Sequence, residues 1–161
     1  MENLRIYRID DNYIHFLHSM DRRVQYNKDL RRPYVGVVLY VGSYRYFVPM
    51  ESPKPNHAKI KPGKHILKLD GGRLGILGFN NMVPVPECAL VPFDIFQEPD
   101  PKYRELLLSQ LFECNRHKTD IFNRASSTFF SVVNRRNSFI VGISCDFLKL
   151  QSACNHYRPG K

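Results

Sequence analysis

The chain has 161 residues, a length at which we expect one domain, residues 1–161, with an ordinary hydrophobic core. Lysine and arginine number 24 against 15 acids, and the net charge of +9 points to a polyanionic partner. Nucleic acid is the first candidate, ahead of an anionic membrane surface, and composition alone also permits a basic surface without any partner. We expect no secretory leader, because charges occupy the first residues, and no membrane span, because no apolar run is long enough. The expected location is the cytoplasm.

The first third of the chain predicts a strand, a helix and a loop. Residues 4–9 alternate between apolar and polar side chains, which predicts a strand. Residues 10–21 begin with aspartate and carry apolar side chains at helical spacing, which predicts a short helix. Residues 21–32 contain five cations and show no period, so we expect a loop.

A hairpin and a basic segment follow. Residues 33–50 contain two apolar stretches around Gly42–Ser43, a pattern typical of a β-hairpin. We expect one face of the first strand to carry Val35, Val37, Leu39 and Val41. No acid occurs from Ser52 to Leu69, whereas five lysines do: Lys54, Lys59, Lys61, Lys64 and Lys68.

Helices dominate the second half. A short strand is expected at residues 65–70. Residues 71–86 contain several Gly and Pro residues, which predict short strands separated by turns. Asp100 and Pro101 predict the start of a long helix, and residues 120–133 predict another. We expect residues 138–145 to form a last strand and residues 146–154 a final helical turn. The order of elements predicts an α+β fold with a mostly antiparallel sheet.

Several common motifs are missing from the sequence. It contains no phosphate loop, dinucleotide fingerprint, HExxH or CxxC motif, and no pair of acids stands out as a metal site. His15 and His18 are three residues apart, but a solvated helix face explains them better than a metal. We expect reduced thiols, mostly as small core side chains, at Cys88, Cys114, Cys145 and Cys154.

The candidate functional residues lie in the two basic loops. Lysine and arginine neutralise phosphates, and Tyr26 has a ring on which an unpaired base can stack. Ser52 stands at the end of a strand, before the rigid Pro53, and Lys54 follows in a position to face the same cleft. A solvated, proline-stiffened loop explains these residues equally well.

Four sequence segments resemble a known family. They are IYRIDDNYIHFL; RPYVGVVLYVGSYRYFVPMESPK, which ends in a serine-proline-lysine motif with His57 three residues beyond Lys54; RLGILGFNNMVPVPE; and KYRELLLSQL. In this order they resemble the toxin component of type III toxin–antitoxin systems, the ToxN/AbiQ endoribonuclease family, from about Ile6 to the region of Cys154.

The resemblance implies a fold and an activity. The fold would be a strongly twisted, mostly antiparallel sheet flanked by helices, similar to the MazF/Kid group. The activity would be metal-independent RNA cleavage without a cofactor, leaving 2′,3′-cyclic phosphate and 5′-hydroxyl ends. The partner would be a repeated pseudoknot RNA antitoxin that the toxin trims, and with which it forms a closed ring. Cellular mRNA would be the substrate and abortion of phage infection the role, with no membrane or direct DNA function.

The resemblance also implies residue roles. Ser52 and Lys54 match the active-site serine and lysine of the family, and Tyr26 is the best match for a tyrosine of the upstream loop, which is shorter here. Arg32, or else Lys28 or Arg31, would supply a second cation. Glu51 stands where some relatives have a small hydroxyl residue. The expected RNA contacts are Lys28, Arg31, Arg32, His57, Lys59, Lys61, Lys64, Arg116 and Lys118.

Two points stay open from the sequence. His57 has a side chain suited to acid–base catalysis, although an RNA contact or a surface position is favoured slightly. A non-catalytic RNA-binding module remains the alternative to an enzyme. A peripheral membrane protein is disfavoured, because the sequence lacks a long basic amphipathic helix.

Overall fold

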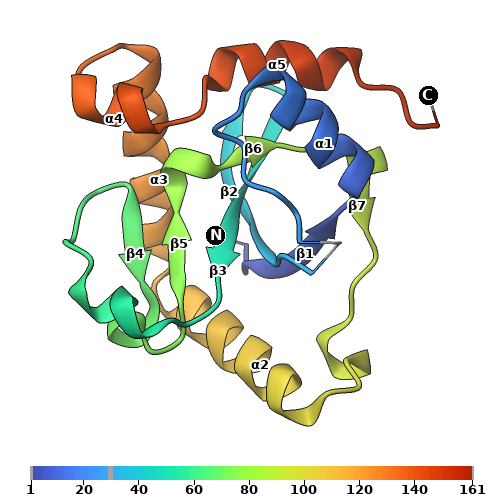
Figure 1. The fold of residues 1–161 in the computed structure, drawn as a ribbon, viewed down its shortest axis with the longest axis vertical. Helices are drawn as coiled ribbons and strands as arrows, with labels where there is room; N and C mark the ends of the chain where they lie inside the picture. The colour runs from blue at the N-terminus through green and yellow to red at the C-terminus, as the bar shows by residue number, and fades with distance from the viewer. Residues whose placement is uncertain (1, 29–30, 161) are drawn as a thin grey trace.

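A computed structural model describes residues 2–28 and 31–160 and has an antiparallel sheet with helices around it (Figure 1). Neighbouring strands follow the order β4-β5-β3-β2-β1-β7, and β6 pairs with β3 off this path. The strands are β1 (Arg5–Ile9), β2 (Tyr34–Val41), β3 (Tyr44–Glu51), β4 (Ile66–Lys68), β5 (Ile76–Gly78), β6 (Val83–Pro84) and β7 (Leu90–Val91). The predicted α+β class with an antiparallel sheet is confirmed.

Helices form most of the chain beyond residue 100. They are α1 (Asp11–Met20), α2 (Pro101–Arg116), α3 (Lys118–Val133), α4 (Ser138–Ile143) and α5 (Phe147–His156). The predicted caps are present: the side chain of Asp10 accepts a hydrogen bond from the backbone N–H of Asn12, and that of Asp100 accepts from Lys102. α1 lies beside α5, and α3 packs against β2 (Figure 1). In the part of the chain described, no helix has the length and hydropathy needed to cross a membrane.

The hairpin forms as predicted, but its buried face differs. Val35 pairs with Val48, whereas Leu39 pairs with Tyr46, so the register shifts between these two points. A shift of this kind interrupts the alternation of side chains. Val35 and Val38 are buried, whereas Val37, Leu39 and Val41 are half-buried against the core, so the buried side chains of β2 do not follow the expected alternation throughout. The Phe47 ring occupies the space that a side chain on Gly36 would need, which explains a glycine in the middle of β2.

Residues 138–145 do not form the expected last strand. Residues 138–143 form α4, and the side chain of Asn137 caps it by accepting hydrogen bonds from the N–H groups of Phe139 and Ile140. A short apolar run fits a strand and a helix equally, and here the cap favours the helix. The following segment, expected as one helical turn, is the ten-residue α5.

An aromatic cluster holds the C-terminal helices on the sheet. The Phe129 ring of α3 lies 5.5 Å from that of Tyr46 on β3, and the Phe147 ring at the start of α5 lies 5.6 Å from Phe129. Cys114 and Cys145 are buried in the core, and burial raises the pKa of each thiol to about 12. Cys88 is exposed, so the expectation of core thiols holds for only part of the set.

Candidate active site

A cavity of about 540 Å³ opens where the first basic loop meets the end of β3. The pairing of β2 with β3 brings these two segments together. Tyr34, at the start of β2, pairs with Pro49 near the end of β3, and the backbone N–H of Met50 donates to the carbonyl of Pro33. An antiparallel hairpin places the residues before its first strand beside those after its second. The cavity lining is Arg8, Lys28, Arg31, Arg32, Pro33, Met50, Ser52, Glu98 and Tyr103.

The loop before β2 is tied to β1 by a buried asparagine. The side-chain amide of Asn27 donates to the carbonyl of Ile9 at 2.6 Å and to the carboxylate of Asp11 at 2.7 Å. Lys28, the next residue, adopts a left-handed backbone conformation with φ of 51°. These anchors fix the backbone that presents Lys28 to the cavity.

Arg32 is a buried cation with unused hydrogen-bonding capacity. Only 7% of its surface is exposed, and its Nε donates to the carbonyl of Tyr26 at 2.8 Å. Its Nη1 is buried and meets no acceptor among the described residues. A buried guanidinium N–H group without an acceptor is costly, and an anion in the cavity would provide one.

Lys28 belongs to a cluster of cations that includes Lys54. Burial lowers the pKa of Lys28 first, the positive charges of Arg32 and Lys54 lower it further, and the carboxylate of Glu51 opposes the shift. The structure therefore brings four predicted residues to one cavity: Lys28, Arg31, Arg32 and Ser52. Lys54 lies within electrostatic reach of them, although it is not among the cavity-lining residues.

His57 lies behind the serine-proline-lysine turn and not on its surface. It is only 1% exposed. Its Nδ1 accepts from the backbone N–H of Lys54 at 3.3 Å, and its Nε2 lies 3.3 Å from a carboxylate oxygen of Glu51. Because Nδ1 is an acceptor, the neutral ring carries its hydrogen on Nε2 and donates to Glu51. This burial argues against the expected direct RNA contact and makes His57 a support for the turn.

Tyr26 lies apart from the cavity lining. Its side chain is 61% exposed, and its ring stacks at 4.3 Å on the ring of His18. The Nδ1 of His18 lies 2.8 Å from the carbonyl of Val24, so His18 supports the loop. The geometry leaves the Tyr26 ring open to solvent, where a base can stack, and Tyr26 is not among the residues that line the cavity with Ser52.

The remaining predicted contacts lie outside the cavity, and all of them are exposed except the half-buried Lys118. Lys59, Lys61 and Lys64 lie between β3 and β4 and point away from the core. Arg116 forms an ion pair with Glu113 at 3.5 Å, and Lys118 donates to the side chain of Asn3 at 3.2 Å. None of these five lines the cavity.

Three cavity residues with polar groups on their side chains were absent from the sequence-based prediction: Arg8, Glu98 and Tyr103. Arg8 lies on β1 with its guanidinium carbon 4.4 Å from the centre of the Phe93 ring. Burial raises the pKa of Tyr103, while Arg8 opposes the shift by charge and hydrogen bonding. The available signal for Arg8 was a second arginine, after Arg5, in a five-residue strand. Among the described residues, no group of three or more histidine, cysteine or acidic side chains is placed to hold a metal.

Comparison with known proteins gives a consistent result. Residues 5–155 match the family model described as "Toxin ToxN, type III toxin-antitoxin system". The chain is 31% identical to endoribonuclease ToxN of Bacillus thuringiensis subsp. kurstaki, over 98% of the chain and 86% of the relative. It is 27% identical to endoribonuclease AbiQ of Lactococcus lactis subsp. lactis, over 96% of the chain and 89% of the relative.

Solved structures agree with the sequence comparison. A type III toxin structure, described in terms of selective toxin inhibition by a non-coding RNA pseudoknot, aligns with a TM-score of 0.87 at 31% identity. That alignment covers 98% of this chain and 99% of the other. The AbiQ structure, described as a lactococcal anti-phage endoribonuclease, aligns with a TM-score of 0.82 at 27% identity, over 96% and 97% of the two chains. The chain therefore belongs to the ToxN family of type III toxin–antitoxin toxins, whose relatives compared above are endoribonucleases.

Proposed function

We propose that the cavity between the first basic loop and the end of β3 is the catalytic centre of this family member's endoribonuclease activity. The observation that carries the proposal is the buried Arg32, whose unpaired Nη1 belongs to a cavity that also contains Ser52 and Lys28. Four cations and one acid line this cavity, which suits a phosphate group. Sequence membership in the ToxN family supports RNA as the polymer.

The cleavage reaction needs no protein nucleophile. The ribose 2′-hydroxyl attacks the adjacent phosphorus while the bond to the 5′-oxygen breaks, which gives a 2′,3′-cyclic phosphate and a 5′-hydroxyl. The enzyme must align these atoms and stabilise the negative charge of the transition state. Ser52 donates a hydrogen bond to a non-bridging oxygen, and Arg32 and Lys54 neutralise the charge there. Lys54 then gives a proton to the leaving oxygen.

Lys28 is the candidate for a second proton transfer. Its lowered pKa means that it releases its proton more readily than an ordinary lysine does. A lysine with this property, placed at the cavity with Ser52, is suited to accept the proton of the 2′-hydroxyl. Tyr26 contributes by stacking on a base outside the cavity.

The membership in the ToxN family also indicates an RNA partner. One relative's structure is described as a toxin inhibited by an RNA pseudoknot, and another as an anti-phage endoribonuclease. For this chain we propose a repeated pseudoknot RNA that it trims, that inhibits it and that closes a protein–RNA ring. Cellular mRNA in the bacterial cytoplasm is the substrate when the inhibitor is lost, and the role is defence against phage. The exposed Lys59, Lys61 and Lys64 extend the phosphate-binding surface.

The test is to identify the RNA that copurifies with the protein. Wild type, Ser52→Ala and the control Ser43→Ala are purified from cells that also carry the DNA upstream of the gene. Ser43 lies in the exposed turn at the far end of the same hairpin. We expect short uniform RNA with 5′-hydroxyl and cyclic phosphate ends from wild type and Ser43→Ala, and unprocessed RNA from Ser52→Ala. Heterogeneous RNA that is identical in all three preparations would contradict the assignment.

A further inference from the structure

A second, smaller pocket lies on the other side of the end of β3. Its volume is about 170 Å³, and its lining includes Pro49 and Glu51, whereas Met50 and Ser52 line the larger cavity. Alternate residues of a strand point to opposite faces, so the two pockets flank one strand end. The loop before β2 contributes to both, with Gln25 in the small pocket and Lys28 in the large one. A single-stranded RNA crossing this strand end would therefore reach both pockets.

Three side-chain amides dominate this small pocket: Gln25, Asn80 and Asn81. The Nδ2 of Asn80 donates to the carbonyl of Ile143 at 3.1 Å, and the Nδ2 of Asn81 donates to the carbonyl of Arg23 at 2.8 Å. A backbone carbonyl only accepts, so these bonds fix which end of each asparagine is nitrogen.

The orientation of Gln25 follows from that of Asn81. The Oδ1 of Asn81 accepts from the Nε2 of Gln25 at 3.0 Å, which leaves the Oε1 of Gln25 on the opposite side of its amide. This oxygen is buried and meets no donor among the described residues. Each amide nitrogen thus uses one of its two hydrogens on a protein acceptor and turns that end of the amide toward the protein, while the oxygens of Gln25 and Asn80 keep acceptor capacity for a ligand.

The charges around the pocket exclude a phosphate. Its lining includes the carboxylate of Glu51 and, among the described residues, neither lysine nor arginine. His65 also lines it, and burial together with the nearby Arg124 lowers the pKa of that imidazole, which keeps it neutral near pH 7. The apolar side chains of Ile66 and Ile76 complete the lining. The pocket offers acceptors and apolar contacts, so its ligand is flat or compact and donates hydrogen bonds.

We propose that this amide pocket receives one unpaired nucleobase of the RNA and selects bases with an exocyclic amino group over uracil. Adenine, cytosine and guanine each carry an amino group that donates hydrogen bonds, whereas uracil presents carbonyl oxygens at the corresponding positions. A carbonyl oxygen facing the oxygens of Gln25 and Asn80 would leave both sides without a donor, which is costly in a buried site. This inference rests on the proposed function, because it deepens the substrate choice of the same enzyme.

Gly78 provides a clean test, because a methyl group there would enter the pocket. Its backbone is extended, with φ of −109° and ψ of 97°, so alanine is tolerated. The added Cβ would lie 3.5 Å from the Oδ1 of Asn80 and 3.6 Å from the Oδ1 of Asn81, which is ordinary contact. Gly78→Ala therefore fills the pocket and removes no polar group. Gly142→Ala is the matched control, since its methyl group would meet nothing within 4 Å.

The experiment is cleavage of a pool of RNAs with randomised sequence, with the new 5′-hydroxyl ends mapped for each protein. For wild type and Gly142→Ala we expect one position near the cut at which uracil is about tenfold depleted, the size of one or two unmade hydrogen bonds. For Gly78→Ala we expect this depletion to fall to about twofold or less, while preferences at other positions stay. Thermal unfolding checks that each variant is folded, and Gln25→Met, which removes the unpaired acceptor at similar length, replaces Gly78→Ala if that variant unfolds.

The outcomes separate this proposal from the assignment of the enzyme. Wild type that cleaves the pool without disfavouring uracil at any position would overturn the amide pocket and leave the endoribonuclease standing. The same holds if Gly78→Ala and Gln25→Met both keep the full discrimination of wild type. Wild type that fails to cleave any RNA in the pool would overturn both proposals.

Discussion

Glu51 lies at the end of β3, between Met50 and Ser52 of the larger cavity and directly before the serine-proline-lysine turn. It lines the amide pocket, accepts from the ring of His57 and raises the pKa of Lys28 against the lowering effects of burial, Arg32 and Lys54. One carboxylate beside a group of cations sets how readily those cations lose their protons. Directly before the serine-proline-lysine turn, this chain therefore has a group that tunes charge.

Glu51→Gln keeps the shape of the side chain and an oxygen that accepts from His57, but it removes the negative charge. We expect the pKa of Lys28 to fall further, because the negative charge of Glu51, which raises it, is lost. A lower lysine pKa means that the positive charge disappears at a lower pH. The alkaline limb of RNA binding should move to lower pH, which is measured by titrating the Lys28 amine by NMR and by binding assays between pH 7 and 10. An unchanged or raised lysine pKa would contradict this account.

His57→Ala tests whether this histidine supports the turn or acts on RNA. The change leaves the backbone N–H of Lys54 and the carboxylate of Glu51 without their ring partner and opens a void. We expect a loss of about 2–4 kcal/mol in the free energy of unfolding, together with weaker cleavage. Urea denaturation and cleavage assays measure the two effects, with the exposed neighbour Asn56→Ala as control. Full stability with abolished cleavage would instead assign His57 a direct catalytic role.

At the scale of elements, helices with a clear capping residue could be predicted from the sequence. Features that depend on packing against other elements could not. Asp10, and Asp100 with Pro101, mark α1 and α2 in the sequence, and both caps are present. The shift in β2 depends on Phe47 of the partner strand filling the space above Gly36, which no pattern within β2 reveals. α4 was mistaken for a strand because its apolar run is too short for periodicity to decide.

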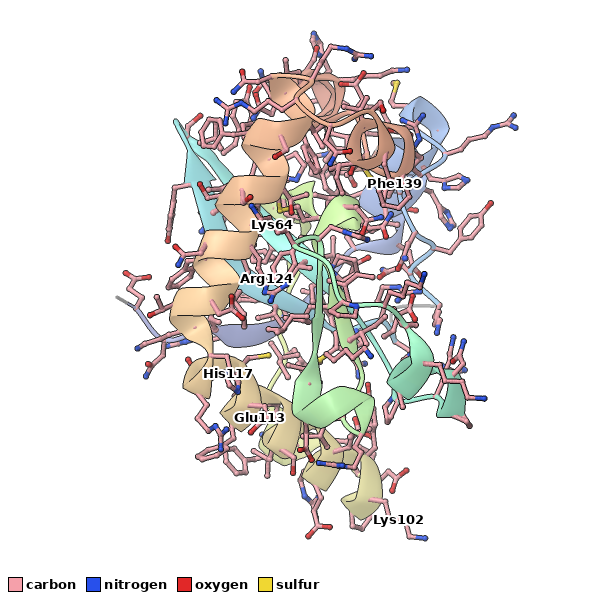
Figure 2. All side chains as sticks on the ribbon, turned by 90° about the vertical axis from the view of Figure 1, so that its left-hand side faces the viewer. Lys64, Lys102, Glu113, His117, Arg124 and Phe139 are labelled. Atoms are coloured by element: carbon pink, nitrogen blue, oxygen red, sulfur yellow. The ribbon has the colours of Figure 1, made fainter. Side chains whose placement is uncertain are left out.

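Arg124 of α3 holds the end of the basic segment between β3 and β4, whose lysines the sequence predicts to bind RNA. From α3, its Nη1 donates to the carbonyls of Gly63 and Ile66 at 2.6 and 2.7 Å, while its Nε bonds to the carboxylate of Asp120 (Figure 2). Its charge therefore fastens the end of the basic segment, where Lys64 lies, to the helix. A cation engaged in this way is a support and not a free phosphate contact.

Arg124→Ala should loosen this segment while leaving the core intact. We expect the backbone amides of residues 63–68 to exchange hydrogen at least about tenfold faster, because two charge-assisted hydrogen bonds are lost. Amides in α1 and α5 should keep their protection. Hydrogen exchange followed by mass spectrometry measures both, with Arg136→Ala, an exposed arginine beyond α3, as control. Equal exchange in the two variants would show that Arg124 does not hold the segment.

At the scale of the whole molecule, the candidate site is assembled by the hairpin. The serine-proline-lysine turn and the loop with Lys28 and Arg32 were predictable as one site, because a hairpin places these segments together. Arg8 and Tyr103 were not, because they come from β1 and α2, and only the assembled fold brings them to the cavity. The position of His57 also depends on the assembled fold. Its basic neighbours in the sequence predicted a surface contact, but its side chain is buried.

The buried cysteines make a prediction about the stability of the whole chain at high pH. Burial raises the pKa of Cys114 and Cys145 from an ordinary value of 9.0 to about 12. Between these values the unfolded chain has lost its thiol protons and the folded chain has kept them. The free energy of unfolding therefore falls as the pH rises through this window, and the stabilising effect is fully present below pH 9.

Two such thiols should cost roughly 3–4 kcal/mol in the free energy of unfolding between pH 8.5 and 10.5, since one pKa unit corresponds to about 1.4 kcal/mol. Urea denaturation in reducing buffer at the two pH values measures this loss. The double variant Cys114→Ala and Cys145→Ala is less stable at both, because each alanine leaves a small void, but it should lose less stability on going to pH 10.5. The buried tyrosines Tyr13, Tyr34 and Tyr46 remain in both proteins, so the difference between the two losses isolates the thiols. Equal losses would mean that the thiols ionise in the folded protein as readily as in the unfolded chain, and that their burial does not hold the protons.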